Sequence, residues 1–178
     1  MTTVAKAKGL QIWQIFLLYK TAFPREERKP FRRILSMTKQ GRADLWTICA
    51  DGRFAGFAST VNAPNLVLLD YFAVKKSLRG RGVGSEALAL LNNAYRDRGF
   101  FMEIESTLEP APNLRQRQKR KDFYVRCGME PMGTEADVFG IRMELLGVRC
   151  HLRLEEYRNF YRDHYSPWAA QHIREVHS

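Results

Sequence analysis

The sequence has little cysteine and no long apolar run, and each shortage argues against a class of protein. Its three cysteines, Cys49, Cys127 and Cys150, are an odd number and show no C-x-x-C spacing. They argue against a disulfide framework and a zinc site, and they favour a reducing compartment. The longest apolar run is far too short to span a bilayer, and the chain does not open on a cationic stretch followed by an apolar one. We expect a cytoplasmic protein that binds no membrane and no metal.

The chain also lacks internal repeats and low-complexity linkers. Hydrophobic residues make up 45% of its 178 residues, with 11 Phe, 7 Tyr and 3 Trp, and this composition argues against disorder. The length suits one domain with a substantial core. We expect that domain to span residues 1–150, and we expect a helical extension, residues 151–178, to pack on it.

Acidic residues are fewer than basic ones: 19 Asp and Glu stand against 29 Lys and Arg, which gives a net charge of +10. Such a charge is typical of nucleic-acid binding, because Lys and Arg displace counterions from phosphates. It also attracts a strongly anionic small ligand. A solvated basic surface with no partner is the third interpretation.

The most informative stretch is a glycine-rich loop between an expected strand and an expected helix. Residues 66–74 are apolar enough for a buried strand, and apolar residues recur at helical spacing from Gly84 to Arg98. Between them lies RGRGVGS, residues 79–85. Glycines bring a ligand close to bare backbone N–H groups, and the first amides of a helix carry partial positive charge. With Arg79 and Arg81 adding charge, the segment predicts a phosphate site.

The spacing of the glycines indicates which kind of phosphate site this is. A P-loop ends its glycine run on Lys-Ser or Lys-Thr, whereas this run ends on Gly84-Ser85-Glu86. A dinucleotide fingerprint reads G-x-G-x-x-G, whereas these glycines read G-x-G-x-G. The loop does fit Arg79-x-x-Gly82-x-Gly84. This segment resembles the R/Q-x-x-G-x-G/A pyrophosphate signature of the Gcn5-related N-acetyltransferases (GNAT).

The resemblance covers roughly residues 10–147 and is most specific over Tyr71–Ser85 and Asp122–Met129. The pyrophosphate signature alone is weak, but Phe123-Tyr124-x-Arg126-x-Gly128 follows it about 40 residues later. Glycines that serve only the geometry of a helix start are the alternative. Given the loop and the resemblance, we weigh coenzyme A and a plain basic surface above nucleic acid as the reason for the positive charge.

Periodicity and turn residues give the order of the elements. The sequence predicts helices over residues 10–23, 31–38, 84–98, 114–127 and 152–165, and strands over residues 45–50, 53–59, 66–74, 101–106, 129–133 and 138–146. Asp51-Gly52 predicts a hairpin turn, Pro110 and Pro112 predict a loop, Pro167 is expected to end the last helix, and the order of residues 168–178 stays open. The pattern is typical of a mixed α/β (α+β) layered fold.

GNAT proteins have this order of elements, so the resemblance implies their fold. That fold has a mostly antiparallel sheet flanked by helices on both faces. In it, the strand before the glycine loop and the next strand splay apart, and the pantetheine arm of the coenzyme pairs with the exposed backbone.

Acetyl transfer to an amine needs a base for the amine, a donor for the oxyanion and a proton for the leaving thiolate. The resemblance implies Tyr124 as the general acid and the backbone N–H of Val74 as the oxyanion donor. A tyrosine that only packs in the core is the alternative. For the base, Glu105 is the first candidate and Asp70 the second, and relay through water is the third possibility. Cys127 is not assigned as a nucleophile, because no His lies in a matching motif.

The resemblance also implies which residues hold acetyl-CoA. They are Phe72, Ala73 and Val74 on the strand, and Arg79, Gly80, Arg81, Gly82, Val83, Gly84 and Ser85 in the loop. Many relatives have an Asn seven residues before the tyrosine that bonds the pantetheine; this chain has Arg117 there, and Asn113 is a weak substitute. The basic helix that contains Arg117 either meets the coenzyme phosphates or is a solvated face.

The prediction is an acetyl-CoA-dependent N-acetyltransferase that acts by direct attack in a ternary complex on the primary amine of a small acceptor. Four glutamates, Glu26, Glu27, Glu103 and Glu105, suggest that the acceptor is cationic. The rivals are an acyl-CoA-binding regulatory module without turnover and, less favoured, a basic nucleic-acid-binding protein. A homodimer is an open expectation for its assembly.

Overall fold

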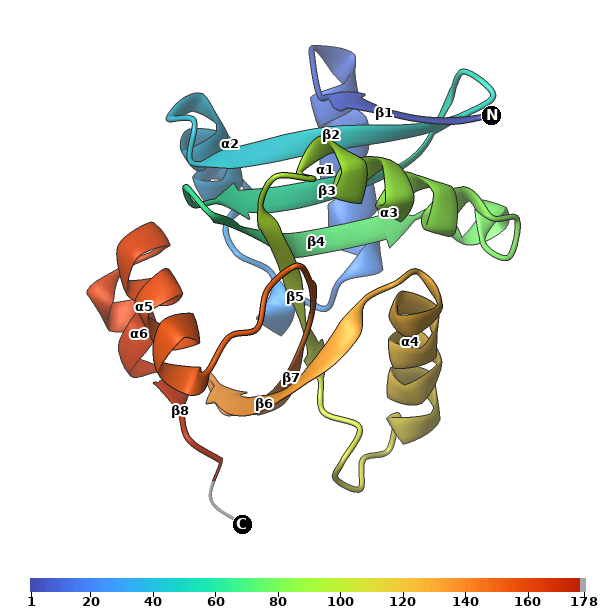
Figure 1. Cartoon of the computed structure of the whole chain (residues 1–178). Coiled ribbons are helices and arrows are strands. Elements are labelled where there is room, and N and C mark those ends of the chain that lie inside the picture. Colours follow the sequence, from blue (N-terminus) through green and yellow to red (C-terminus); the bar gives the residue numbers. More distant parts are fainter. Residues whose placement is uncertain (177–178) are drawn as a thin grey trace. The chain divides into compact units, whose positions relative to one another are not determined.

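The computed structural model describes residues 1–176, except for the side chain of Glu26. Figure 1 shows its helices, its strands and the short 3₁₀ turns η1 and η2. The bounds are β1 Thr2–Lys6, α1 Leu10–Ala22, η1 Arg25–Glu27, α2 Phe31–Lys39, β2 Ala43–Ala50, β3 Arg53–Asn62, β4 Leu66–Val74, η2 Lys76–Leu78, α3 Val83–Ala94, β5 Gly99–Glu105, α4 Leu114–Arg126, β6 Glu130–Val138, β7 Ile141–Val148, α5 Leu154–His164, α6 Pro167–Gln171 and β8 Ile173–Arg174. No helix in this part of the chain is both long and apolar enough to cross a membrane.

The chain forms two compact units. Unit 1 contains Met1–Asn62 and Leu69–Arg96, and unit 2 contains Ala63–Leu68 and the chain from Asp97 onward. The residues expected to form a C-terminal extension, 151–176 in the described chain, belong to unit 2 together with β5, β6 and β7.

The strands of the described residues form one sheet in the order β1-β2-β3-β4-β5-β7-β6-β8. Its ladders from β1 to β2, β2 to β3, β5 to β7, β7 to β6 and β6 to β8 are antiparallel, and β4 pairs with β5 in parallel. The mixed, mostly antiparallel fold is therefore confirmed. The parallel ladder joins Leu66–Leu68 to Gly99–Phe101. The later residues of β4 and β5 lie in different units, so the splay between them stays a prediction.

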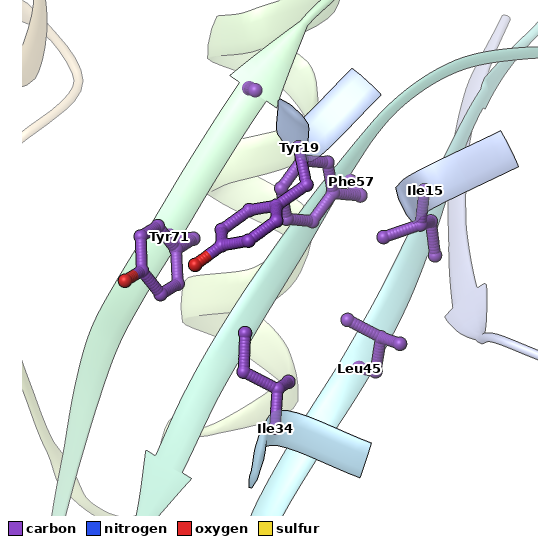
Figure 2. Packing of buried hydrophobic residues seen from close by; sticks show 7 residues of the cluster. Ile15, Tyr19, Ile34, Leu45, Phe57 and Tyr71 are labelled. Carbon is purple, nitrogen blue, oxygen red and sulfur yellow. The ribbon is translucent and has the colours of Figure 1, made fainter. Parts of the chain in front are cut away.

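Unit 1 packs helices on both faces of its strands. One face carries a buried cluster with α1 and α2, shown in Figure 2: Ile15, Tyr19, Ile34, Leu45, Phe57, Tyr71 and Ala73. The other face carries a cluster with α3: Ile48, Ala55, Val74, Val83 and Ala87. Because successive side chains of a strand point to opposite faces, Ala73 packs toward α1 and α2 while Val74 packs toward α3.

Two hairpin turns contain left-handed backbone, one at residue types that favour it and one not. The turn of Asp51 and Gly52, with φ 49° and 74°, joins β2 to β3 and confirms the predicted hairpin. A similar turn joins β6 to β7 at Phe139 and Gly140, with φ 54° and 84°. The sequence placed that second break earlier, between residues 133 and 138, because a phenylalanine is an uncommon turn residue.

Several elements at the chain's ends differ from expectation. Strand β1 was not predicted, although Thr2–Lys6 pairs with Trp46–Ala50 as an edge strand. Helix α5 ends at His164, before Pro167, and Pro167 begins a further helix, α6, because Ser166 caps that helix and proline suits its first turn. In the tail, β8 pairs with β6, while residues 177–178 lie outside the described residues.

Unit 2 packs two helices against its strands by different means. Helix α5 uses aromatic packing: the rings of Tyr157 and Phe160 lie edge-on to Phe101 of β5, at centroid distances of 6.4 and 5.1 Å. Helix α4 is held against the strands by an ion pair. Lys121 forms an ion pair with Glu144 of β7, whose other oxygen accepts bonds from the backbone N and the hydroxyl of Thr107 at 2.5 and 2.7 Å.

Glu144 is 6% exposed, so its charge depends on these partners. Burial raises the pKa of Glu144, but the bonds from Lys121 and Thr107 outweigh it and leave the pKa below its ordinary value. A carboxyl group with a depressed pKa in the folded state stabilises the protein above its unfolded pKa. That stability is lost as the pH falls through the folded value.

We expect Glu144→Gln to lower the free energy of unfolding at pH 7 by about 3 kcal/mol, because it leaves the Lys121 ammonium without its partner. Urea denaturation followed by circular dichroism would measure this loss. Below the unfolded pKa of about 4.3, the gap between wild type and variant should narrow, because the wild-type carboxylate is then being protonated. A gap that stays constant between pH 7 and pH 3 would contradict the assigned ion pair.

Candidate functional site

The glycine loop forms the open N-terminus of α3. Gly80 and Gly82 have left-handed backbone, φ 75° and 80°, and Gly82 caps the helix. The first intrahelical bond runs from Glu86 N to Gly82 O at 3.0 Å, so the amides of Val83, Gly84 and Ser85 have no acceptor within the helix. A Cβ on Gly80 would meet nothing within 4 Å, so the surface over the loop is open. This geometry can hold an anion.

Packing below the loop fixes the direction of the helix. Val83 is buried at 7% exposure against Val74 and Ile48, so the first turn of α3 is tied to the end of β4. The side chain of Arg79 folds back, and its Nε donates to Val74 O at 3.1 Å. Arg81 and Ser85 are exposed. Both arginines therefore lie close to the open amides along the chain, and the side chain of Arg79 is tethered to the strand while Arg81 is exposed to solvent.

The edge of β4 carries a backbone donor at Val74. The N–H of Lys75 bonds Ala55 O of β3 at 2.8 Å. Since N–H groups alternate sides along a strand, the N–H of Val74 points away from β3, on the side where its own carbonyl accepts Arg79. The predicted coenzyme-binding residues Phe72, Ala73 and Val74 are the last three residues of β4, ahead of the glycine loop.

Gly56 is a site residue that the sequence reasoning missed. It lies in β3, and a Cβ there would come within 2.3 Å of Ala73 O and 3.1 Å of Val74 Cα. The backbones of β3 and β4 therefore approach each other closely at the position of the predicted oxyanion donor. A glycine inside a strand pattern is the signal that indicates such an approach.

Asp70, the second candidate for the base, forms an ion pair with Lys29. Its Oδ1 lies 2.6 Å from Lys29 Nζ, and its side chain is 9% exposed. Taking up a proton would therefore break this ion pair. Lys29 belongs to the connection between α1 and α2, so the pair ties that connection to β4.

Two buried tyrosines fix the same connection. Tyr19 donates to Lys29 O at 2.9 Å, and Tyr71 accepts from Lys29 N at 3.0 Å and donates to Glu27 O at 2.9 Å. Figure 2 shows both rings side by side, from α1 and β4. Burial raises the pKa of Tyr19 to about 12 and raises that of Tyr71 further, so both hydroxyls remain protonated donors. The segment expected to flank the acceptor is thus held in place within unit 1.

Tyr124, the predicted general acid, lies in the last turn of α4 in unit 2 and is 6% exposed. Burial raises its pKa to about 12, and the nearby Arg120 offsets only part of that rise. None of the described residues forms a hydrogen bond with its hydroxyl. A buried phenol without a partner can serve a ligand, although it is a weaker acid than the unperturbed phenol that the sequence argument assumed.

Glu105, the first candidate for the base, lies between two arginines of α4. Its oxygens are 2.9 Å from Arg117 Nη2 and 3.2 Å from Arg120 Nη1. Asn113 Oδ1 accepts from Arg117 Nε at 2.8 Å. The two residues expected to contact the pantetheine, Asn113 and Arg117, are therefore already joined to each other and to Glu105. Protonation of Glu105 would therefore break its ion pairs with both arginines.

The described glutamates that suggested a cationic acceptor already contact other residues of the protein. A carboxylate oxygen of Glu103 accepts a hydrogen bond from the Tyr161 hydroxyl at 2.7 Å, and Glu105 forms ion pairs with Arg117 and Arg120. The side chain of Glu26 lies outside the described residues, and Glu27 makes contacts of its own. The structure thus assembles one group of predicted residues in unit 1, around the glycine loop, and another in unit 2, around Tyr124 and Glu105.

Comparisons with known proteins agree with this geometry. The sequence model described as the acetyltransferase (GNAT) family matches residues 11–129. A search of curated proteins finds no match. A Bacteroides thetaiotaomicron structure described as coming from the GNAT family is similar, with TM-score 0.75 and 18% identity over 94% of this chain and 98% of that one.

Two other solved structures have related folds. The ribosomal-protein-S18-alanine N-acetyltransferase of Escherichia coli has TM-score 0.64 and 13% identity, over 85% of this chain and 96% of that one. An aminoglycoside 6′-N-acetyltransferase complexed with coenzyme A has TM-score 0.67 and 12% identity, over 82% and 96%. At these identities the likeness shows the fold.

We expect Gly56→Ala to destabilise the protein by about 2–3 kcal/mol, since the added methyl must displace the backbone of β4. Gly147→Ala is the matched control, because its Cβ would meet the end of a flexible side chain, Met132 Cε at 2.1 Å, with Cys150 Sγ and Phe100 O further away at 3.1 and 3.3 Å, and should cost less. Thermal unfolding of both variants would test the difference. Equal losses would show that the close approach at Ala73 places no special demand on position 56.

Proposed function

The chain belongs to the acetyltransferase (GNAT) family, and we propose that it is an acetyl-CoA-dependent N-acetyltransferase acting on a primary amine. The observation that carries this proposal is the loop after β4, where left-handed Gly80 and Gly82 open α3 onto bare amides beside Arg79 and Arg81. That combination suits a pyrophosphate group. The coenzyme A in one of the similar solved structures supports the choice of ligand.

In the proposed reaction, the amides of Val83 to Ser85 and the two arginines hold the pyrophosphate. The edge of β4 from Phe72 to Val74 offers backbone groups to the pantetheine arm. The N–H of Val74, which points away from β3, would stabilise the oxyanion that forms when the amine attacks the thioester carbonyl. Acetyl-CoA supplies the activated acetyl group, and the protein supplies position and charge.

The proton steps would use Tyr124 and water. When the tetrahedral intermediate collapses, the C–S bond breaks, the thiolate takes a proton from the Tyr124 hydroxyl, and the tyrosinate recovers a proton from solvent. The attacking amine loses its proton to water, since Asp70 and Glu105 would each have to give up ion pairs to accept it. A cationic acceptor stays a secondary expectation, because Glu105 is paired with two arginines and Glu103 is hydrogen-bonded to Tyr161.

A thiol-release assay would test the proposed activity against its rival on the same fold. An acetyltransferase and a regulatory module would both bind coenzyme A, but only the enzyme would release free thiol from acetyl-CoA when amines are added. Polyamines, aminoglycosides, amino acids and peptides form a suitable acceptor panel. Binding without thiol release from any of these amines would favour the regulatory module.

We expect Gly82→Val to abolish coenzyme A binding, because a branched side chain at φ 80° strains the loop and covers the open amides. Isothermal titration would measure the loss. Gly41→Val is the matched control: Gly41 has φ 72°, open space around its Cβ and an exposed position between α2 and β2, outside the residues proposed to hold the coenzyme. It carries the same backbone strain and should keep full affinity. A folded Gly82→Val protein with wild-type affinity would overturn the coenzyme assignment.

We expect Tyr124→Phe to lower kcat about 10²-fold with little change in coenzyme affinity, because only a proton donor is lost. The value of kcat/KM should fall with kcat, since the loss belongs to the transition state. If Tyr124 acts through an acid form that persists up to a pKa of about 12, wild-type kcat should still hold at pH 10. A variant with full kcat, or a wild type that loses half its rate by pH 10, would argue against this role.

A further inference from the structure

A shallow hollow on the α1 side of unit 1 has the composition of an anion site. It has a volume of about 420 Å³. Its lining comes from the start of α1, the β2–β3 hairpin and the residue after β4: Gln11, Gln14, Thr47, Cys49, Gly52, Arg53, Phe54 and Lys75. Every polar side chain in this set can donate a hydrogen bond.

The hollow carries positive charge that no neighbouring carboxylate cancels. Arg53 and Lys75 contribute two cations, and no Asp or Glu lines the hollow among the described residues. Lys75 Nζ lies 4.9 Å from the ring centroid of Phe54, which holds the ammonium at the wall. Asp51, in the adjacent turn, is paired with the amino group of Met1 at 2.6 Å.

Gln11 is oriented by its neighbours. Its Oε1 accepts bonds from Lys8 N at 3.1 Å and from the hydroxyl of Thr47 at 3.3 Å. The carbonyl end of the amide is therefore occupied, and the NH₂ end keeps its two donors for another partner. A fixed amide donor beside two cations is an arrangement that recognises an oxyanion.

The hollow is separate from the glycine loop. Gln11 and Gln14 belong to α1, which packs on one face of the strands, whereas the loop opens into α3, which packs on the other. Lys75 links the two places along the chain, since it follows β4 directly and its N–H is anchored on Ala55 O at 2.8 Å.

We propose that this hollow binds a small molecule through a phosphate group, at a site distinct from that for the coenzyme pyrophosphate. Gln11, Arg53 and Lys75 bind the phosphate oxygens, and Gln14 and Thr47 line the remaining space. A phosphate suits the site better than a carboxylate, because its oxygens can accept from all of these donors at once. The proposal stands independently of the acetyltransferase assignment.

Inorganic phosphate is the probe, with binding measured by isothermal titration; every variant, and the wild type for comparison, is titrated in the Gly82→Val background, because the glycine loop is itself proposed to bind an anion. Gln11→Glu is the sharpest variant, because it keeps the acceptor for Lys8 and Thr47 while it replaces the NH₂ donor by a second oxygen. Its affinity for phosphate should fall roughly tenfold or more, as should that of the double variant Arg53→Gln/Lys75→Gln. Gln116→Glu and Arg32→Gln/Lys39→Gln make the same charge changes at exposed positions outside the hollow and should bind like wild type. Unchanged affinity in Gln11→Glu would overturn the proposal.

A second arm separates a free phosphate compound from the coenzyme's own 3′-phosphate. The double variant is titrated with coenzyme A and with dephospho-coenzyme A, and both affinities should equal those of the wild type. A loss for coenzyme A alone would assign the hollow to the 3′-phosphate and overturn the separate site. Gly82→Val should still bind inorganic phosphate in the hollow, so failure of the coenzyme assignment and failure of this proposal give different results.

Discussion

Unit 1 depends on the two-sided packing of β4. Tyr71 and Ala73 enter the cluster with α1 and α2, and Val74 enters the cluster with α3. Because successive side chains of a strand point to opposite faces, this short run of residues contacts the helices on both faces. The glycine loop follows this strand after the short turn η2, and Arg79 and Val83 tie it back to Val74 at the end of the strand.

The same strand gives the α1–α2 connection its place. Tyr71 bonds the backbone at both Glu27 and Lys29, and Asp70 pairs with the Lys29 side chain. A proline-flanked bend of charged residues would otherwise be a flexible surface segment. Here the cost of burying two phenols and a carboxylate is offset by hydrogen bonds that fix the bend against β4.

In unit 2, several basic residues of helix α4 form ion pairs that hold the helix on the sheet. On α4, Arg117, Arg120 and Lys121 face Glu105 and Glu144, while Arg115, Lys119 and Arg126 are exposed. Three of the six basic residues of this helix thus neutralise carboxylates of the sheet, and the other three are exposed.

Patterns of local origin were predictable, and long-range pairings were not. The Asp51-Gly52 turn, the strand at residues 66–74 and the glycine loop each have a residue type that imposes a backbone conformation. Edge strands β1 and β8 have no such mark, because their pairing depends on partners 35 or more residues away along the chain, as for Val4 with Ile48 and Ile173 with Val138. For the same reason Glu105 looked like a free carboxylate in the sequence, while its arginines lie 12 and 15 residues further on.

The interleaving of the two units in the chain limits how this protein can change in evolution. The backbone passes from unit 1 to unit 2 after Asn62, returns after Leu68 and leaves again after Arg96. Strand β4 itself is divided, since Leu66–Leu68 pair with β5 in unit 2 while Tyr71 to Val74 pack in unit 1. No single cut of the gene yields either unit as a continuous piece. An exchange of residues 97–178 alone would therefore place a foreign β5 against the native Leu66–Leu68, and it succeeds only where the two sequences match along that ladder.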